Sequence, residues 1–173
     1  MKKIVAAVAI LASLNLWAIN VGEKPAEVTI SGENGGMAKD ASPWNSKSIK
    51  DKVYVMFYVD PDEKDLNEAF SDALKAKNYR EKGAYGSIAV VNLAATWKPN
   101  VIIESLLKSK QEEFPNTIYV KDKNSVLVKE WDLADNNSDI IIFDKDGTVL
   151  FYKAGKMEDA DMQKAFTIIE EHL

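Results

Sequence analysis

Residues 52–70 constrain the fold of this chain more than any other stretch of the sequence. A run of β-forming residues, Val53–Val59, ends at Asp60-Pro61, and apolar residues then recur at helical spacing over residues 66–74. The strand is almost continuously hydrophobic, which is typical of a strand buried on both faces of a parallel sheet. We therefore expect a central strand that leads through a short turn into a helix, with the turn at the carboxyl edge of the sheet.

The turn after this strand is acidic, and the sequence leaves two interpretations of it open. The acids are Asp60, Asp62, Glu63 and Asp65. The favoured interpretation is that Asp60 or Asp62 caps a helix that begins at once, because acids in a first turn complement the helix dipole. The alternative is a cation or amine site completed by Asn92 or Thr96 from a neighbouring loop, although a hard cation needs about six converging oxygens.

The rest of the chain alternates strands and helices. We expect strands at residues 27–30, 87–93 and 117–120, a Gly-rich turn at 31–36, and a loop or second short strand at 37–42. A helix is expected at 100–113, with Val101, Ile102, Leu106 and Leu107 facing inward. Residues 126–131 fit a short helix or a strand, and the helix is favoured because Leu127 and Trp131 are four residues apart. A hairpin of strands 138–143 and 148–153 and a helix at 157–173 complete the chain. Parallel crossovers followed by a hairpin and a covering helix predict an α/β fold, a thioredoxin-like three-layer sandwich with a central mixed sheet.

The first residues have the pattern of an export signal. Lys2 and Lys3 precede an apolar run that extends to Trp17, and Ala18 supplies the small residue before a cleavage point. We expect a signal peptide at residues 1–18, a single domain at residues 19–173, a periplasmic location and no membrane span after cleavage. An uncleaved N-terminal anchor is the alternative. The chain has 22 basic and 27 acidic side chains, which makes binding to nucleic acid unlikely on electrostatic grounds.

Several kinds of chemistry are excluded by composition. The chain has no cysteine, so it cannot be a thiol oxidoreductase or a thiol peroxidase. Redox proteins of the thioredoxin type also carry a cis-proline before the hairpin, and residues 136–139 read Asn-Asn-Ser-Asp instead. His172 is the only histidine, so a Ser-His-Asp triad is disfavoured and a charge partner at the helix end is expected. Residues 144–147 predict a hairpin turn rather than a calcium loop, because the spacing of a calcium loop is absent.

A set of short motifs resembles one family of exported bacterial proteins. They are Trp44-Asn45-Ser46, Glu63-Lys64 with Asn67, Val91-Asn92, Phe114-Pro115, Asp122, Trp131, Leu133, Ser138 and residues 144–147. Together they resemble the YtfJ family over residues 25–173. The resemblance implies a thioredoxin-like fold and an exported protein, and it implies no catalytic residues because the family has no agreed activity. Some members are nominally labelled transcriptional regulators, a role that the acidic composition argues against.

The sequence favours a binding or interaction domain without redox chemistry and without a cofactor. Its partner would be a periplasmic protein or a small ligand. The residues expected at its working edge are Trp44, Asp60, Asp62, Glu63, Asn92, Trp97, Asn137 and Ser138. For Trp44 an apolar lid over the sheet edge is the preferred role, and Trp97 and Trp131 are expected in the core or at its rim. A hydrolase that uses the acidic turn, with or without a metal, is the alternative function.

Overall fold

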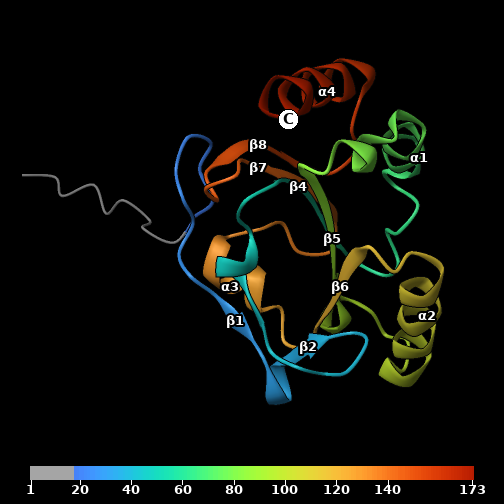
Figure 1. Cartoon of the computed structure of the whole chain (residues 1–173). Coiled ribbons are helices and arrows are strands. Elements are labelled where there is room, and N and C mark those ends of the chain that lie inside the picture. Colours follow the sequence, from blue (N-terminus) through green and yellow to red (C-terminus); the bar gives the residue numbers. More distant parts are fainter. Residues whose placement is uncertain (1–17) are drawn as a thin grey trace, which may run out of the picture.

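The computed structural model describes residues 18–173, apart from the side chain of Lys82 (Figure 1). The predicted export signal therefore lies outside the described residues, except for Ala18. Within the described part of the chain, no helix is long and apolar enough to cross a membrane.

A six-stranded mixed sheet forms the centre of the molecule, in the order β2-β6-β5-β4-β7-β8. The strands are β2 (Gly35–Met37), β6 (Thr117–Asp122), β5 (Tyr85–Asn92), β4 (Val53–Val59), β7 (Ser138–Phe143) and β8 (Val149–Ala154). As predicted, β4 is central: it pairs in parallel with β5, in the register Val55 to Ser87, and antiparallel with β7, in the register Val55 to Ile142. Strand β6 continues the parallel part beside β5, and β8 closes the hairpin.

Helices cover both faces of this sheet. One face carries α1 (Glu68–Lys77), α2 (Asn100–Glu113) and α4 (Asp159–His172), and the other carries α3 (Val126–Trp131), as Figure 1 shows. A separate two-stranded sheet of β1 (Thr29–Ile30) and β3 (Trp44–Asn45) lies on the α3 side. The result is the three-layer arrangement that the order of elements predicts.

The alternation of side chains along β4 divides the core into two parts. Val53 and Val55 pack with Phe70 of α1 and Ile169 of α4. Met56 and Tyr58 point to the opposite face, where they pack with Leu127 and Trp131 of α3. The indole of Trp131 is fully buried and its Nε1–H donates to the carbonyl of Ala26 at 2.8 Å. Trp131 is therefore a core residue, as the sequence predicts.

The predicted start of α1 is wrong. We expected a helix capped by Asp60 or Asp62, whereas residues 61–67 form successive turns and α1 begins only at Glu68. Asp60 instead closes a local turn, because its Oδ1 accepts a hydrogen bond from the N–H of Asp62. Side chains that bond nearby backbone groups compete with helix formation, which explains the delay.

The predicted inward face of α2 is also partly wrong. Leu107 is buried, as expected, but its partner on the buried stripe is Ile103. Val101, Ile102 and Leu106 are exposed by 72%, 52% and 58%. Apolar residues at 101–103 and 106–107 define two overlapping stripes, and only contact with β5 and β6 decides which stripe is buried.

The sequence predicted a Gly-rich turn at residues 31–36 and gave no sign that a strand, β2, begins within it at Gly35. Gly35 and Gly36 pair with Asp122 and Lys121 of β6 at the edge of the sheet. The backbones approach so closely that a Cβ on Gly35 would lie 1.9 Å from the carbonyl oxygen of Lys121. Glycine is therefore required for the pairing itself and not only for a turn.

The hairpin turn at residues 144–147 is confirmed. Gly147 has a φ of +87° and donates its N–H to the carbonyl of Asp144 at 2.9 Å. His172 Nδ1 lies 3.3 Å from Oδ2 of Asp144, so the histidine does have an acidic partner near the helix end.

Candidate functional site

The carboxyl edge of the sheet collects most of the buried polar side chains of the described residues. The parallel strands β4, β5 and β6 end there and β7 begins there. The buried polar residues at this edge are Asp60, Asn67, Asn92, Asp122, Ser138 and Asp139. Buried polar groups need hydrogen-bond partners, so the partners of each group show whether it is free for chemistry or for a ligand.

The turn after β4 is held against β7 by its first residue. Asp60 is only 4% exposed, its N–H donates to the carbonyl of Asn137 at 2.8 Å, and its Oδ1 accepts from the N–H of Asp62 at 2.8 Å. Burial raises the pKa of Asp60 above its ordinary value. Asp60 is therefore a structural group that fixes the turn.

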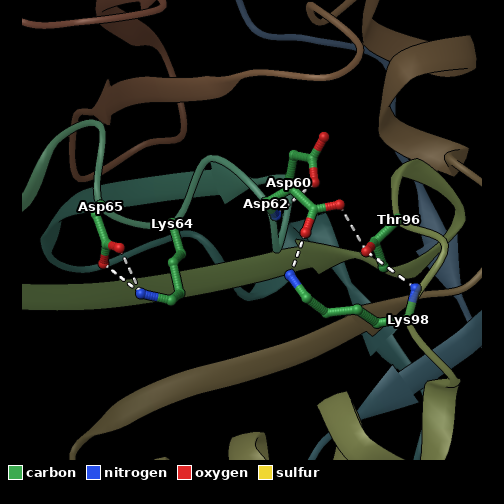
Figure 2. Close-up of polar contacts among 6 residues, drawn as sticks. All are labelled: Asp60, Asp62, Lys64, Asp65, Thr96 and Lys98. Carbon is green, nitrogen blue, oxygen red and sulfur yellow. Dashed lines mark hydrogen bonds and ion pairs between the residues drawn. The ribbon is translucent and has the colours of Figure 1, made fainter.

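The second acid of the turn is neutralised by the next loop of the same edge. Figure 2 shows Asp62 between Lys98 and Thr96, which follow strand β5. Lys98 forms an ion pair with Oδ1, and the Thr96 hydroxyl donates to Oδ2 at 2.8 Å. The hydrogen bond from Lys98, followed by that from Thr96, lowers the pKa of Asp62. In the alternative interpretation the turn would bind a cation or an amine, and in the structure the ammonium group of Lys98 occupies this position at Asp62.

The other acids of the turn remain on the surface. Lys64 pairs with Asp65 further along the turn, away from Asp62 (Figure 2). Glu63 is exposed and forms no ion pair within residues 18–173. In the same range, no three acidic or histidine side chains are grouped so that they could hold a metal ion. The cation-site interpretation of the turn has no supporting geometry.

Asn67 joins three segments at this edge. Its Nδ2 donates to the carbonyl of Ser138 at 3.2 Å, to the Ser138 hydroxyl at 3.1 Å and to the carbonyl of Gly155 at 3.1 Å. Its Oδ1 accepts from the N–H of Met157 at 2.8 Å. The predicted edge residues Asn137 and Ser138 belong to the same network, since Asn137 Oδ1 accepts from the N–H of Ser138.

Asn92 forms its hydrogen bonds with segments other than the acidic turn. Its Oδ1 accepts from the N–H of Ala94 at 3.2 Å and from the Ser125 hydroxyl at 3.0 Å, and its Nδ2 donates to Asp135. Of the two residues expected beside the acidic turn, Thr96 contacts Asp62 and Asn92 does not. Lys98 was not predicted, although a basic residue in the loop after the next parallel strand is a signal for such an ion pair.

Asp122 organises the start of α3. Its carboxylate accepts from the N–H groups of Val126 at 2.8 Å and Leu127 at 3.1 Å, and from the Tyr58 hydroxyl at 3.1 Å. Burial, followed by the charge of Asp122, raises the pKa of Tyr58 far above its ordinary value. The phenol therefore remains a proton donor to this carboxylate.

Asp139 is the one member of the group whose hydrogen bonding is incomplete. Its side chain is fully buried, Oδ2 accepts from the N–H of Ala134 at 2.9 Å, and Oδ1 has no partner in the described residues. Burial raises its pKa to about 6. Asp139 was not among the residues expected at this edge, although an acid inside an otherwise apolar strand is a signal of a buried carboxyl group.

The two tryptophans predicted at this edge have opposite environments. Trp44 is only 2% exposed and packs in the core on the α3 face, so it cannot contact a partner. Trp97 is 85% exposed in the loop before α2. Trp97, Val101, Ile102 and Leu106 are the large hydrophobic side chains exposed on this loop and helix, and we call these four residues the α2 patch.

Residues 15–172 match the family described as "Bacterial protein of unknown function (YtfJ_HI0045)". An uncharacterized protein of Haemophilus influenzae is 28% identical over 146 residues, which cover 83% of this chain and 77% of that protein. The uncharacterized protein YtfJ of Escherichia coli is 25% identical over 133 residues, which cover 75% and 72%.

Solved structures show the fold alone, because their sequence identities are low. The exposed lipoprotein thioredoxin Etrx1 of Streptococcus pneumoniae matches with a TM-score of 0.57 and 14% identity over 84% of this chain and 99% of that one. A thiol-disulfide isomerase of Corynebacterium glutamicum matches with a TM-score of 0.56 and 16% identity over 80% and 90%. The predicted thioredoxin-like fold is confirmed, in a chain without cysteine. Its sequence shows that the chain belongs to the YtfJ family.

Proposed function

We propose that this protein is a non-enzymatic binding domain of the periplasm that recognises another protein through the α2 patch. The observation that carries the proposal is the 85% exposure of Trp97 beside three further exposed apolar side chains of α2. Tryptophan side chains are highly buried on average, and tryptophan is enriched among the residues that dominate protein–protein affinity. The partner surface that fits is an apolar segment with a basic residue at its flank.

The size of the patch supports a protein partner. From the full areas of these side chains, the four residues together expose on the order of 500 Å², which is in the range of the largest patches of monomeric proteins, and such patches are often functional. Between Ile102 and Leu106 along α2, the exposed residue is Ser105. The centre of the surface is therefore uncharged, as is typical of the core of an interface.

A negative charge beside the α2 patch supports a partner with a basic residue next to its apolar segment. Thr96 and Lys98, on either side of Trp97, contact Asp62, which places the acidic turn next to the patch. Lys98 compensates Asp62, whereas Glu63 carries an exposed carboxylate without an ion pair in the described residues. A basic side chain of a partner would form an ion pair with this carboxylate, and complementary charges at the rim of an interface favour fast and selective association.

The polar edge supports binding over turnover. Catalytic groups need a free lone pair or proton at a site that a substrate reaches. Hydrogen bonds within the fold engage the side chains of Asn67, Asn92 and Asp122. Asp139 is fully buried, so a substrate would not reach it. The thiols that perform redox chemistry at this edge in thioredoxins are absent from the chain. The periplasmic location rests on the pattern of residues 1–18, and cell fractionation tests it.

The test combines capture with a quantitative binding assay. A partner captured from periplasmic extract is purified, and its affinity is measured for the wild type, Trp97→Ala and Leu106→Ser. We expect losses of at least about tenfold for each variant, as for central interface residues. Val21→Ala is the matched control, because Val21 is 61% exposed and lies outside the patch.

Two outcomes would overturn the proposal. One is a partner that binds Trp97→Ala as tightly as the wild type. The other is a concentration-dependent dimer of the wild type alone that Trp97→Ala abolishes, which would assign the α2 patch to a second copy of the chain.

A further inference from the structure

A pocket of about 330 Å³ opens at the amino edge of the sheet, where β4, β5 and β6 begin. Its walls include Lys52, directly before β4, and Arg80, from the turn η3 (Tyr79–Lys82) that precedes β5. The three strands are parallel, so this edge is opposite the one that carries Asp60 and Trp97. The pocket is therefore independent of the surface proposed for partner binding.

The charge of the pocket is opposite to the charge of the chain. Lys52 and Arg80 line it, and no acidic side chain does. Neither cation forms an ion pair within residues 18–173, although the chain has more acidic than basic side chains. Burial raises the pKa of Tyr54 in the pocket wall, and the negative charge of Asp51 raises it further by a smaller amount. Two uncompensated cations beside a concave surface indicate an anion site.

Arg80 is oriented for this role by the protein. Its Nη2 donates to the hydroxyl of Thr117 at 2.6 Å, and Thr117 is itself only 7% exposed. The other N–H groups of the Arg80 side chain form no hydrogen bond with the described residues, and a guanidinium presents them as the fork that suits phosphate and carboxylate oxygens. Tyr85 also lines the pocket, and burial raises its pKa to about 12, so its hydroxyl remains protonated.

One wall of the pocket is apolar and aromatic. The ring of Tyr54 lies across Gly86, where a Cβ would come within 2.2 Å of a ring carbon. Ile118, half-buried on β6, lies on the same wall. An anion with an organic body would place its charged end against the cations and its body against this wall. Pockets of about 300 Å³ or more are of the size that holds small ligands.

We propose that this pocket binds a small phosphate monoester. Arg80 and Lys52 hold the phosphate group, and Tyr54 and Ile118 contact the organic part. The charge supports this ligand, because two cations match the charge of about −1.5 to −2 that a phosphate monoester carries near neutral pH. A phosphate also presents its oxygens to a guanidinium fork in pairs.

The test is calorimetric titration of the purified full chain at low salt with inorganic phosphate, phenyl phosphate and succinate. We expect phenyl phosphate to bind more tightly than inorganic phosphate, because only phenyl phosphate contacts the apolar wall, and succinate to bind weakest. Arg80→Gln and Lys52→Gln should each weaken phenyl phosphate by at least about tenfold, as expected for loss of a charged hydrogen bond. Lys50→Gln is the matched control, since Lys50 is an exposed lysine two residues away that does not line the pocket.

The proposal is overturned by any of three results. These are no binding at concentrations up to about 10 mM, equal losses in Lys50→Gln and Lys52→Gln, or tighter binding of succinate than of phenyl phosphate. Thermal unfolding without ligand shows that the variants remain folded, and Arg80 and Lys52 are exposed enough for that to be expected.

Discussion

The hydroxyl of Tyr152 on β8 donates to Oδ2 of Asp139 on β7 at 3.3 Å, inside the core between the hairpin and α3. The N–H of Ala134 donates to the same oxygen, and Oδ1 has no partner in the described residues. The carboxyl therefore titrates in an environment that disfavours its charge, and stability must depend on its protonation.

Asp139→Asn is expected to change how stability depends on pH. Burial raises the pKa of Asp139 from 3.8 to about 6. Between these values the folded protein holds a proton that the unfolded chain has lost, so this group lowers the free energy of unfolding as pH rises from about 4 to 6. At about 1.4 kcal/mol per pH unit, the penalty at pH 7 is on the order of 3 kcal/mol.

Urea unfolding of wild type and Asp139→Asn at pH 4, 5, 6 and 7 measures this effect. The difference in free energy of unfolding should move in favour of the variant by about 2–3 kcal/mol across the range. Parallel curves for the two proteins would show that Asp139 titrates as it does in the unfolded chain. The absolute offset between the curves is not diagnostic, because an amide also adds a donor to the site.

Asn67→Ala should destabilise the protein strongly. The substitution leaves the carbonyl of Gly155 and the N–H of Met157 without the partner that Asn67 supplies, whereas the carbonyl of Ser138 still accepts from the N–H of Gly155. Unsatisfied buried groups cost about 1–3 kcal/mol each before water relieves part of the loss. We expect a decrease of about 2–4 kcal/mol in the free energy of unfolding, measured with urea. Asn100→Ala, at an exposed residue that starts α2, should change it by less than about 0.5 kcal/mol.

Gly35→Ala should remove β2 from the sheet. Both Gly35 and Gly32 have positive φ, at +121° and +58°, but only Gly35 has a backbone oxygen where the Cβ would be placed. Gly32→Ala measures the conformational cost alone, which is about 1 kcal/mol. Hydrogen exchange should show loss of protection at Met37 and Lys123 in Gly35→Ala only, because both amides are hydrogen-bonded where β2 meets its neighbours. Equal protection in both variants would contradict the proposed contact.

The two tryptophans Trp97 and Trp131 should differ sharply in their effect on stability. Trp97→Ser should leave the free energy of unfolding within about 0.5 kcal/mol, because the side chain is 85% exposed. Trp131→Ala should lower it by about 3–5 kcal/mol, since the side chain is fully buried and its N–H bonds Ala26. A large loss in Trp97→Ser would place this residue in the core and would remove the α2 patch as a binding surface.

Prediction from the sequence succeeded where one residue pattern has one solution. The run at residues 53–59 is apolar on both faces, so it had to be a central strand, and β4 is central. The turn at residues 144–147 needed a positive φ, and Gly147 supplies it. The family resemblance agreed with the sequence match, and the thioredoxin-like fold that it implied is confirmed.

Prediction failed where several patterns overlap or where the deciding contact is distant in the chain. The acids at residues 60–65 satisfied the rules for a helix cap, but Lys98, more than thirty residues later, takes Asp62 into an ion pair instead. The apolar residues of α2 form two stripes along the helix, and the stripe with Ile103 and Leu107 is the one that is buried. Trp44 was expected at the edge because nothing nearby in the sequence shows that it belongs to the same core cluster as Leu127 and Trp131 of α3.

The sequence alone determined the mixed α/β sheet, its central strand and the absence of thiol chemistry, because hydrophobic periodicity and composition are local properties. Tertiary structure alone decided which polar groups are consumed by the fold, which helix face stays in water, and where Lys52 and Arg80 meet. The physical reason is that burial and electrostatic compensation depend on neighbours from distant parts of the chain. Those neighbours are set by how strands and helices pack, and no local pattern records them.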